Sequence, residues 1–282
     1  MSVTDMVKSI TVSSANDCAC AMAEHIAGSE AAFVEKMNQR ARELGMNDTN
    51  FVNCTGLDDG EAAEPHKTSA YDIALMSREL MLHHPDIKKF TTIWMDTVRD
   101  GAFGLSNTNK LIRFYPGATG LKTGFTQGAG YCLSATAERE GLELMAVVMG
   151  CETSQQRTAA CKAMLDYGFA NYAYVQADLS NLGTVPVTLG KAKEIAVTPG
   201  NNPCLLVEKG QKNSVTTKIT LAESVDAPVQ AGQVLGSLTI RAGDQILGQV
   251  PLVAQDAVPR LSWGDLFLLT LRQVCMAQEE AE

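Results

Sequence analysis

The chain has 282 residues, of which 45% are hydrophobic and 20% charged, and its formal net charge at pH 7 is -9. This is the composition of an ordinary soluble globular protein, and the length suits two domains or one large domain. The acidic balance argues against nucleic acid as a partner, because binding phosphates requires clustered lysine and arginine side chains.

Residues 1–10, MSVTDMVKSI, have neither the apolar stretch nor the small-residue cleavage site of a signal peptide. No run of apolar residues is long enough to predict a transmembrane helix. Taken alone, these features predict a cytosolic protein, but an incomplete N-terminus would remove that argument.

Helices and strands are predicted to alternate over the first two-thirds of the chain, beginning with helices. Residues 13–17 offer polar N-cap residues before a run of small side chains at 18–23, which predicts a tightly packed, buried helix. Apolar residues between 33 and 44 recur at spacings of four, four and three, which predicts the apolar face of a second helix. After a loop rich in Asn, Asp and Gly, either Thr68 or Ser69 is expected to cap a third helix.

The middle of the chain has a different pattern. Pro85 is expected to open a short turn or helix. Residues 117–150 predict three consecutive antiparallel strands joined by short turns, and the last of them, 142–149, should be buried. A helix is then predicted over 154–172.

Beyond a boundary predicted near 173–180, short Val, Ile, Thr and Leu runs are separated by Gly, Pro, Asn and Asp. They predict a small all-β domain of the sandwich type over 175–260, with a hairpin turn at 242–244. Residues 261–282 predict an amphipathic helix and an acidic tail, opened by a loose capping box of Ser262 and Asp265. The apolar face of that helix is predicted to hold Trp263, Leu266, Phe267, Leu271 and Val274.

The eight cysteines form no C-x-x-C pair, and with the four histidines they show no zinc-site spacing. We therefore predict no metal site and no cofactor. Cys18 and Cys20 lie two positions apart on a predicted helix and so point to different faces. We interpret them as small buried residues rather than as a redox pair.

Two short motifs stand out for their chemistry. Ser14-Ala15-Asn16 opens the first predicted helix, and Lys122-Thr123-Gly124 lies on the first of the three strands. Together with Ser-x-x-Lys, such motifs form the signature of penicillin-binding proteins and serine β-lactamases. Each tripeptide alone is weakly specific, since Ser-x-Asn before a helix also serves as a cap.

Longer segments in the same order strengthen the signal. They are Ser14-Ala-Asn-Asp17, Gly28-Ser-Glu30, Phe51-Val-Asn-Cys-Thr-Gly-Leu57, Thr68-Ser-Ala-Tyr-Asp72, Asn107-Thr-Asn-Lys110, Gly117-Ala-Thr-Gly-Leu-Lys-Thr-Gly124 and Ala129-Gly-Tyr-Cys132. With these segments the chain resembles the low-molecular-mass penicillin-binding proteins, the serine-type D-Ala-D-Ala carboxypeptidases. The resemblance covers roughly residues 1–172. It implies a mixed α/β (α+β) transpeptidase-like domain over 1–174, N-terminally incomplete, followed by the small β domain.

The resemblance also implies how substrate is bound. The substrate is a peptidoglycan stem peptide that ends in D-Ala-D-Ala with a free carboxylate. Lys122, Thr123 and Thr126 would bind this carboxylate, and Gly124 would let the peptide backbone approach the strand closely. Phe125 lies near the second backbone N–H of the family's oxyanion hole.

Ser14 and Asn16 take catalytic roles in this reading. Ser14 would relay a proton between the nucleophile, the lysines and the leaving amine, and Asn16 would hydrogen-bond the substrate and position the catalytic lysine. Helix capping stays open as an alternative for both residues, and the two roles are compatible. His66 lies in a similar region of the family, and we interpret it as structural rather than as a base.

The family's nucleophile is missing from the printed sequence. No serine is followed by lysine three residues later, and the nearest cases, Ser106 with Lys110 and Ser214 with Lys218, are one residue too long. The chain as given is therefore expected to be inactive. We interpret it as a fragment of an enzyme whose first domain would expose apolar surface and be poorly stable.

Two other interpretations stay open. One is a natural pseudoenzyme that binds peptidoglycan without a nucleophile. The other is a β-lactamase, which uses the same motifs, although the second β domain and the C-terminal helix argue against it.

The resemblance finally implies partners and location. β-Lactam antibiotics would bind if the full-length site is present, and the protein would be extracytoplasmic, in the cell envelope. Residues 261–282 resemble the family's membrane-surface anchor, although their acidic tail departs from the expected basic flank. Packing on a domain is the alternative for this helix.

Overall fold

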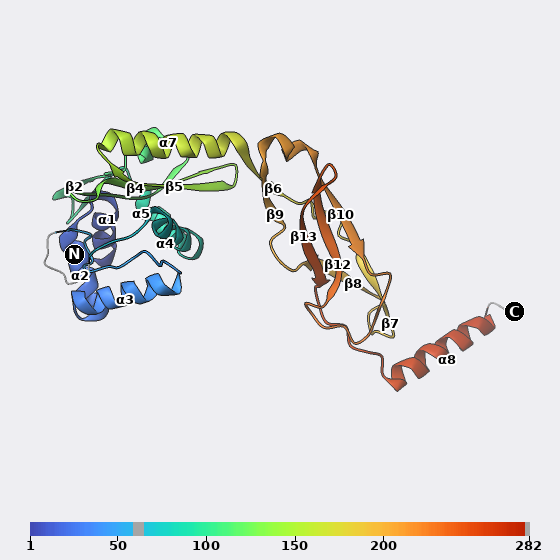
Figure 1. Cartoon of the computed structure of the whole chain (residues 1–282). Coiled ribbons are helices and arrows are strands. Elements are labelled where there is room, and N and C mark those ends of the chain that lie inside the picture. Colours follow the sequence, from blue (N-terminus) through green and yellow to red (C-terminus); the bar gives the residue numbers. More distant parts are fainter. Residues whose placement is uncertain (59–64, 280–282) are drawn as a thin grey trace. The chain divides into compact units, whose positions relative to one another are not determined.

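The computed structural model describes residues 1–58 and 65–279, with side chains described as far as residue 271. The chain divides into two compact units, Met1–Ala170 and Asn171–Glu282. The first mixes helices with antiparallel strands and the second is mainly β (Figure 1). This confirms the predicted class of an α+β domain followed by a small all-β domain.

A three-stranded antiparallel sheet forms the centre of the first unit. It contains β3 (Ala118–Thr126), β4 (Gly130–Arg139) and β5 (Leu142–Cys151) in sequential order, as predicted. The prediction that 142–149 is a buried strand was wrong, because only Leu142 and Ala146 of this stretch are buried. Helix α7 (Ser154–Asn171) lies along one face of the sheet and α4 (Ala70–His83) lies on the other (Figure 1).

Helix α7 approaches the sheet closely because it carries Gly168 at the contact. A Cβ atom at this glycine would lie 2.4 Å from Cδ1 of Leu144. The buried residues Cys161, Leu165 and Phe169 of α7 complete this side of the core. Because β3 is an outer strand of the sheet, one of its edges is not covered by β4.

The N-terminal helix α1 (Val3–Ser13) was not predicted. It begins with a capping box in which Asp5 N–H donates to the Ser2 hydroxyl and Ser2 N–H donates to the Asp5 carboxylate. Val12 is fully buried and packs against a two-stranded sheet of β1 (Met95–Val98) and β2 (Phe103–Ser106). Because so few residues of α1 are buried, its sequence shows little apolar periodicity from which a helix could be predicted.

Helix α2 (Asn16–Ala27) differs from its prediction in two ways. Its N-cap residue is Ala15, without a side-chain cap, because Ser14 instead ends α1 in a left-handed conformation. The predicted capping by residues 13–17 was therefore wrong. Only Cys18 and Ala23 of α2 are buried, so the prediction of a tightly buried helix was also wrong.

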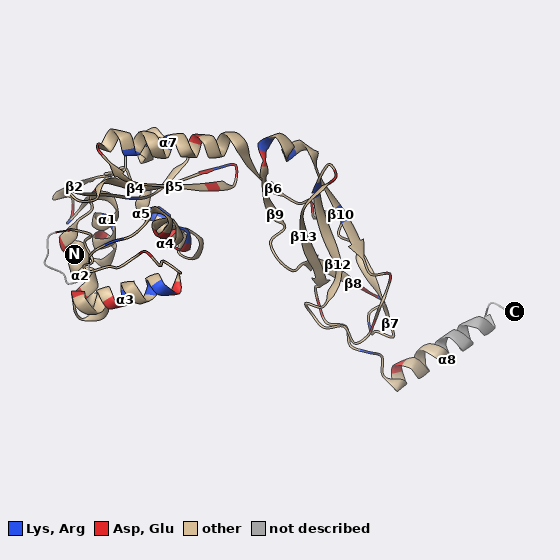
Figure 2. Cartoon of the chain, in the orientation of Figure 1, with Lys and Arg blue, Asp and Glu red and all other residues tan. Residues whose placement is uncertain are grey.

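The remaining helices of the first unit follow the predictions more closely. Helix α3 (Glu30–Glu43) is capped by Ser29, and α4 is capped by Ser69 rather than Thr68. The turn at Pro85 is confirmed as the short helix η1 (Pro85–Ile87), which leads into α5 (Lys88–Thr91). Helix α6 (Leu111–Phe114) precedes the central sheet. Lys and Arg residues are interspersed with Asp and Glu along α3 and α4 (Figure 2).

The second unit is built from a six-stranded sheet in the order β10-β12-β13-β8-β7-β11 and a two-stranded sheet of β6 and β9. Its core includes the fully buried Val185, Leu238 and Leu252. The predicted hairpin turn is present, since Ala242 pairs with Gln245 and Gly243 has a φ of 57°. The strands are β6 (Tyr172–Gln176), β7 (Thr184–Thr188), β8 (Glu194–Pro199), β9 (Cys204–Glu208), β10 (Val215–Leu221), β11 (Val225–Asp226), β12 (Val234–Ala242) and β13 (Gln245–Ala254), with the short helix η2 (Lys209–Ser214) before β10.

Helix α8 (Trp263–Glu279) ends the described chain and begins with the predicted capping box, in which Ser262 and Asp265 bond each other in both directions. As far as residue 271, most of its large apolar side chains are exposed, with Trp263 89% and Phe267 68% exposed. Val274, which was predicted on the same face, lies outside the described side chains. Among the described residues, no helix is both long enough and apolar enough to span a bilayer.

Candidate functional site

The two motifs meet in the first unit although 108 positions separate them. Lys122 on β3 donates from Nζ to the hydroxyl of Ser14 at 2.7 Å and to the carbonyl oxygen of Thr123 at 2.8 Å. Ser14 lies at the sharp turn between α1 and α2, with φ 59° and ψ 43°. A non-glycine residue in this left-handed region costs about 1–2 kcal/mol, so the surrounding structure must hold it there.

Burial gives Lys122 an unusual acidity. Desolvation, with a smaller effect of the positively charged Arg157, lowers the pKa of Lys122 to about 8. The ammonium group therefore carries most of its charge at neutral pH but releases its proton more readily than an ordinary lysine. A lysine of this kind can attract a carboxylate and also take part in proton transfer.

Two other predicted site residues are exposed to solvent. Asn16 is the exposed first residue of α2, two positions beyond Ser14. Gly124 is exposed on β3, and a Cβ atom there would meet Cys132 at an ordinary 3.7 Å, so the packing around it does not itself require a glycine.

Two predicted carboxylate binders have their hydroxyl groups engaged within the protein. Thr123 is buried, and its hydroxyl lies 2.7 Å from that of Thr108. The hydroxyl of Thr126 accepts a hydrogen bond from Ala129 N–H at 3.0 Å in the turn between β3 and β4. Hydrogen bonds from Thr126 and from the Gly128 N–H lower the pKa of Asp58, which joins the 51–58 loop to the same turn.

The segment 107–109 positions β3, although its residues were not among the predicted site residues. Thr108 N–H donates to the carbonyl oxygen of Val12 at the end of α1, which places the two motif-bearing segments next to each other. The buried Asn109 side chain donates to the carbonyl oxygen of Gly120 on β3. The only signal for this segment in the sequence was that Asn107-Thr-Asn-Lys110 resembles a segment of the family.

Arg157 was also not among the predicted site residues. It extends from α7 to the central sheet and is 8% exposed. Its Nη1 donates to the carbonyl oxygens of Gly124 at 2.9 Å and Cys132 at 3.2 Å. A single arginine in the helix predicted over 154–172 carries no motif, so no sequence pattern indicated this contact.

An apolar cavity of about 410 Å³ lies between α4 and the sheet. Lys122 lines it together with Ile73, Met76 and Leu80 of α4. Nearby, the hydroxyls of Ser77 and Ser134 are buried and lie 2.9 Å apart. Large apolar side chains of α2 and α4 are exposed, among them Ile26 at 54%, Tyr71 at 71% and Leu82 at 56%.

The near matches to Ser-x-x-Lys do not form a nucleophile pair. Ser106 ends β2 and Lys110 is the N-cap residue of α6, so the two do not share a helix face. Ser214 and Lys218 belong to the second unit.

His66, which was interpreted as structural, contacts none of the motif residues through a hydrogen bond. Among the described residues, its buried Nδ1 has no hydrogen-bond partner, and its ring contacts Phe51 edge-on with the ring centroids 5.9 Å apart. Burial lowers the pKa of His66.

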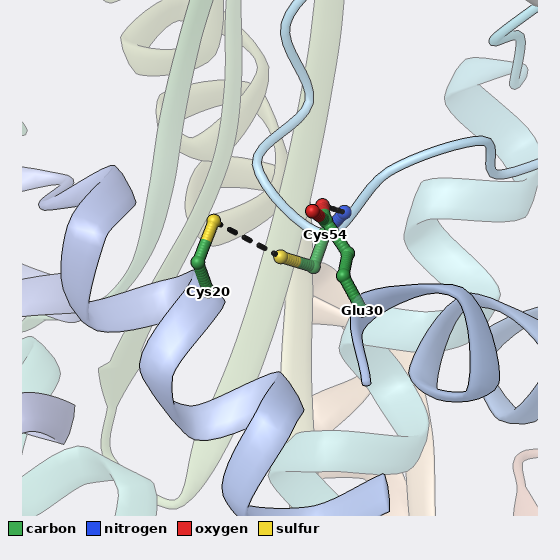
Figure 3. Close-up of side chains that lie close together, drawn as sticks. All are labelled: Cys20, Glu30 and Cys54. Atoms are coloured by element: carbon green, nitrogen blue, oxygen red, sulfur yellow. Dashed lines mark hydrogen bonds between the residues drawn. The ribbon is translucent and has the colours of Figure 1, made fainter. Parts of the chain in front are cut away.

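Three groups that could hold a metal ion also come together in the first unit. Cys20, Glu30 and Cys54 place one ligand atom each within 4.8 Å of one another (Figure 3). Sequence spacing predicted no such cluster, because the residues are far apart and no C-x-x-C pair marks them. Cys20 is half-buried rather than buried as interpreted.

Comparison with known proteins places both units. Residues 1–153 match the family model described as D-alanyl-D-alanine carboxypeptidase, and residues 173–260 match the C-terminal domain of penicillin-binding protein 5. The chain is 41% identical to D-alanyl-D-alanine carboxypeptidase DacF of Bacillus subtilis (strain 168), over 91% of this chain and 66% of that protein. It is 30% identical to D-alanyl-D-alanine carboxypeptidase DacA of Escherichia coli (strain K12), over 91% of this chain and 63% of that protein.

Solved structures agree with these relatives. The chain superimposes on penicillin binding protein 5 from Haemophilus influenzae with a TM-score of 0.73 and 28% identity, covering 92% of this chain and 75% of that one. It also matches penicillin-binding protein D2 from Listeria monocytogenes in its ampicillin-bound form, with a TM-score of 0.55 and 35% identity, over 60% of this chain and 68% of that one. The chain spans slightly less than two thirds of the length of its curated relatives, 66% for DacF and 63% for DacA.

Proposed function

The chain belongs to the D-alanyl-D-alanine carboxypeptidase family, and we propose that it forms the carboxylate-binding and proton-relay part of a serine-type D-Ala-D-Ala carboxypeptidase. The parent enzyme would trim the terminal D-Ala from peptidoglycan stem peptides through an acyl-enzyme. The observation that carries this proposal is the 2.7 Å hydrogen bond from Lys122 Nζ to the Ser14 hydroxyl.

Substrate binding follows from the position of β3. As an outer strand it offers backbone N–H and C=O groups to an extended peptide, which can add as a further strand. Gly124 is exposed and has no side chain to obstruct such a peptide. The ammonium group of Lys122 then supplies the charge that binds the terminal carboxylate.

Proton transfer follows from the Lys122–Ser14 contact. When the peptide bond breaks, the departing D-Ala amine requires a proton, which the Ser14 hydroxyl can give. Lys122 can return a proton to Ser14, because its pKa of about 8 lies close to neutral pH. Each transfer moves one proton across one hydrogen bond, and no charge is left on Ser14.

The acylation step belongs to a Ser-x-x-Lys pair that the printed sequence does not contain. We assign this step to no residue of the chain. With the pair present, we propose that the site also reacts with β-lactams. The Listeria relative was solved with ampicillin and with cefotaxime bound. An extracytoplasmic location in the cell envelope follows from the same proposal.

One observation favours a second candidate function. The Lys122–Ser14 pair and the outer edge of β3 can form in this chain without a nucleophile. A nucleophile-less pseudoenzyme that binds peptidoglycan stem peptides would need only these features.

The test is intact mass spectrometry after incubation with benzylpenicillin. It compares the chain as printed with a form extended through the upstream in-frame codons. A penicilloyl adduct on the extended form alone would support the enzyme. Saturable binding of a D-Ala-D-Ala peptide, with no adduct on either form, would support the pseudoenzyme. An adduct on the chain as printed would contradict the missing-nucleophile interpretation.

A further inference from the structure

Three side chains with metal-binding chemistry converge from three separate segments of the first unit. Cys20 lies on α2, Glu30 is the first residue of α3, and Cys54 lies in the loop that follows α3 (Figure 3). All three are half-buried, so a cation from solvent can reach them. Neither the Lys122–Ser14 pair nor the carboxypeptidase mechanism makes use of them.

The two sulfur atoms stand at the separation that a tetrahedral metal requires. They lie 3.8 Å apart. Two thiolates bound to one Zn²⁺ at about 2.3 Å in tetrahedral geometry are also separated by about 3.8 Å. A disulfide needs about 2.05 Å, so the thiols would have to approach one another considerably to form one. In the structure the Cys54 thiol donates a hydrogen bond to Cys20 Sγ, and the same spacing suits two thiolates that share a metal ion once both have lost their protons.

The carboxylate of Glu30 is already oriented towards the thiols. One of its oxygens accepts the backbone N–H of Cys54 at 3.0 Å, and the carboxylate also forms a hydrogen bond with the Cys54 thiol. Two thiols beside a carboxylate form a donor set for thiophilic divalent cations rather than for Mg²⁺ or Ca²⁺.

The loop that carries Cys54 is fixed on both sides of the residue. The Asn38 side chain accepts the Phe51 N–H at 2.8 Å and donates to the Phe51 carbonyl oxygen at 2.7 Å. The Asn53 side chain accepts the Gly56 N–H at 2.7 Å. Cys54 is thus held near its partners before any cation binds, which reduces the entropy cost of forming a site.

We propose that Cys20, Glu30 and Cys54 form a three-ligand site for Zn²⁺ or a similar thiophilic divalent cation, with its fourth position open to water. On binding, each thiol loses its proton to solvent, and the sulfur electron pair forms the bond to the metal. Bound metal would fasten α2, which begins at Asn16, to the loop that reaches the β3–β4 turn through Asp58. Metal would then stabilise the folded first unit, because the unfolded chain does not hold the three ligands together.

The test is a titration of the reduced, chelator-treated full chain with Co²⁺ and then Zn²⁺. We expect one Co²⁺ per chain, a thiolate-to-cobalt charge-transfer band, loss of that band when Zn²⁺ is added, and a higher melting temperature with Zn²⁺. The Cys20→Ser and Cys54→Ser variants should lose the band. The matched control Cys204→Ser removes a half-buried thiol of the second unit and should keep it.

Glu30→Gln provides a milder variant, because its amide oxygen can still accept the Cys54 N–H. We expect its affinity for Zn²⁺ to fall at least about tenfold, since even changes outside the ligand set commonly have that effect. Far-ultraviolet circular dichroism would check that each variant folds.

Three outcomes would overturn the proposal. These are no stoichiometric uptake by the reduced chain, uptake that persists in both cysteine variants, and a Cys20–Cys54 disulfide in a protein that still takes up no metal after reduction. None of these readouts depends on peptide or β-lactam binding, so failure of the metal site would leave the proposed function untouched.

Discussion

Arg157 donates from Nη1 to the carbonyl oxygen of Gly124 at 2.9 Å, from the face of the sheet that α7 covers. The contact places a buried guanidinium beside the strand that carries Lys122. Its charge adds to the effect of burial in lowering the pKa of Lys122. Arg157 is thus a positioning residue. It holds the backbone of β3 through the Gly124 carbonyl oxygen and lowers the pKa of Lys122, and neither effect requires Arg157 to contact the substrate.

Replacing Arg157 with Met should affect both stability and the lysine. The Gly124 and Cys132 carbonyl oxygens would lose their charged donor, which should destabilise the first unit by about 1–3 kcal/mol. The pKa of Lys122 should rise towards its ordinary value, because a neighbouring positive charge is removed. Chemical denaturation measures the first effect, and the pH dependence of peptide binding measures the second.

Arg139→Met is the matched control for that variant. Arg139 stacks on the rings of Tyr115 and Phe169 in the same unit. Its loss should lower stability without moving the pH profile of binding. An equal displacement of the profile in both variants would contradict the role given to Arg157.

The pKa of Lys122 sets a pH window for binding. Because its folded value of about 8 lies below the ordinary 10.5, the folded protein holds the ammonium less firmly than the unfolded chain does. Stability should therefore rise as pH increases between these values, since the unfolded state binds more protons there. Affinity for a D-Ala-D-Ala peptide should fall over the same window, because the ammonium that attracts the carboxylate is lost.

Isothermal titration calorimetry across this pH window would check the affinity prediction. A Lys122→Met variant, which carries no titrating group at this position, should bind weakly with a flat profile. A wild-type affinity that stays constant between pH 8 and pH 10.5 would show that Lys122 does not bind the carboxylate.

The left-handed backbone of Ser14 makes a paired prediction. Ser14→Ala and Ser14→Gly both lose the hydrogen bond from Lys122, but only glycine adopts a φ of 59° without strain. Ser14→Gly should therefore be more stable than Ser14→Ala by about 1 kcal/mol. Both should weaken peptide binding to a similar extent.

Ser13, the last residue of α1, supplies the control for this pair. There the order should reverse, with glycine less stable than alanine by roughly 0.5–1 kcal/mol, because the backbone is helical. Denaturation curves of the four variants would decide the question, and equal stabilities at position 14 would contradict the left-handed conformation.

How much of the site the sequence could predict depends on whether a residue belongs to a motif. Ser14, Asn16 and Lys122 were proposed as site residues because short motifs in a fixed order mark them. The 2.7 Å contact between Lys122 and Ser14 then follows from a fold that the order of segments already implied. Arg157 escaped, since its role comes from the packing of α7 on the sheet rather than from its neighbours in the chain.

The fold shows the same division. The three-strand sheet and the β domain were predicted, because short apolar runs separated by turn residues repeat through them. Helix α1 was missed, since Ser9 and Val12 are its only buried residues. The Cys20–Glu30–Cys54 cluster was missed because its members are brought together by loop closure, which no local spacing records.

Helix α8 leads to a prediction about membranes. Trp263 and Phe267 are largely exposed, and burying one such side chain is worth about 1.5–3 kcal/mol, or roughly tenfold or more in partitioning. The full chain should cosediment with vesicles of phosphatidylglycerol and phosphatidylcholine, and a chain ending at residue 261 should not. The double variant Trp263→Ser/Phe267→Ser should partition at least about tenfold more weakly.

Two comparisons distinguish a membrane anchor from a helix that packs on its own unit. Thr270→Ser, a conservative change of an exposed residue on the same helix, should leave vesicle binding unchanged. Truncation at residue 261 should also leave the melting of the second unit nearly unchanged, because the apolar side chains of α8 as far as residue 271 are absent from its core and the Lys191–Asp265 ion pair is solvent-exposed. If truncation lowered the melting temperature while vesicle binding persisted, the helix would be a packing element and the membrane prediction would be wrong.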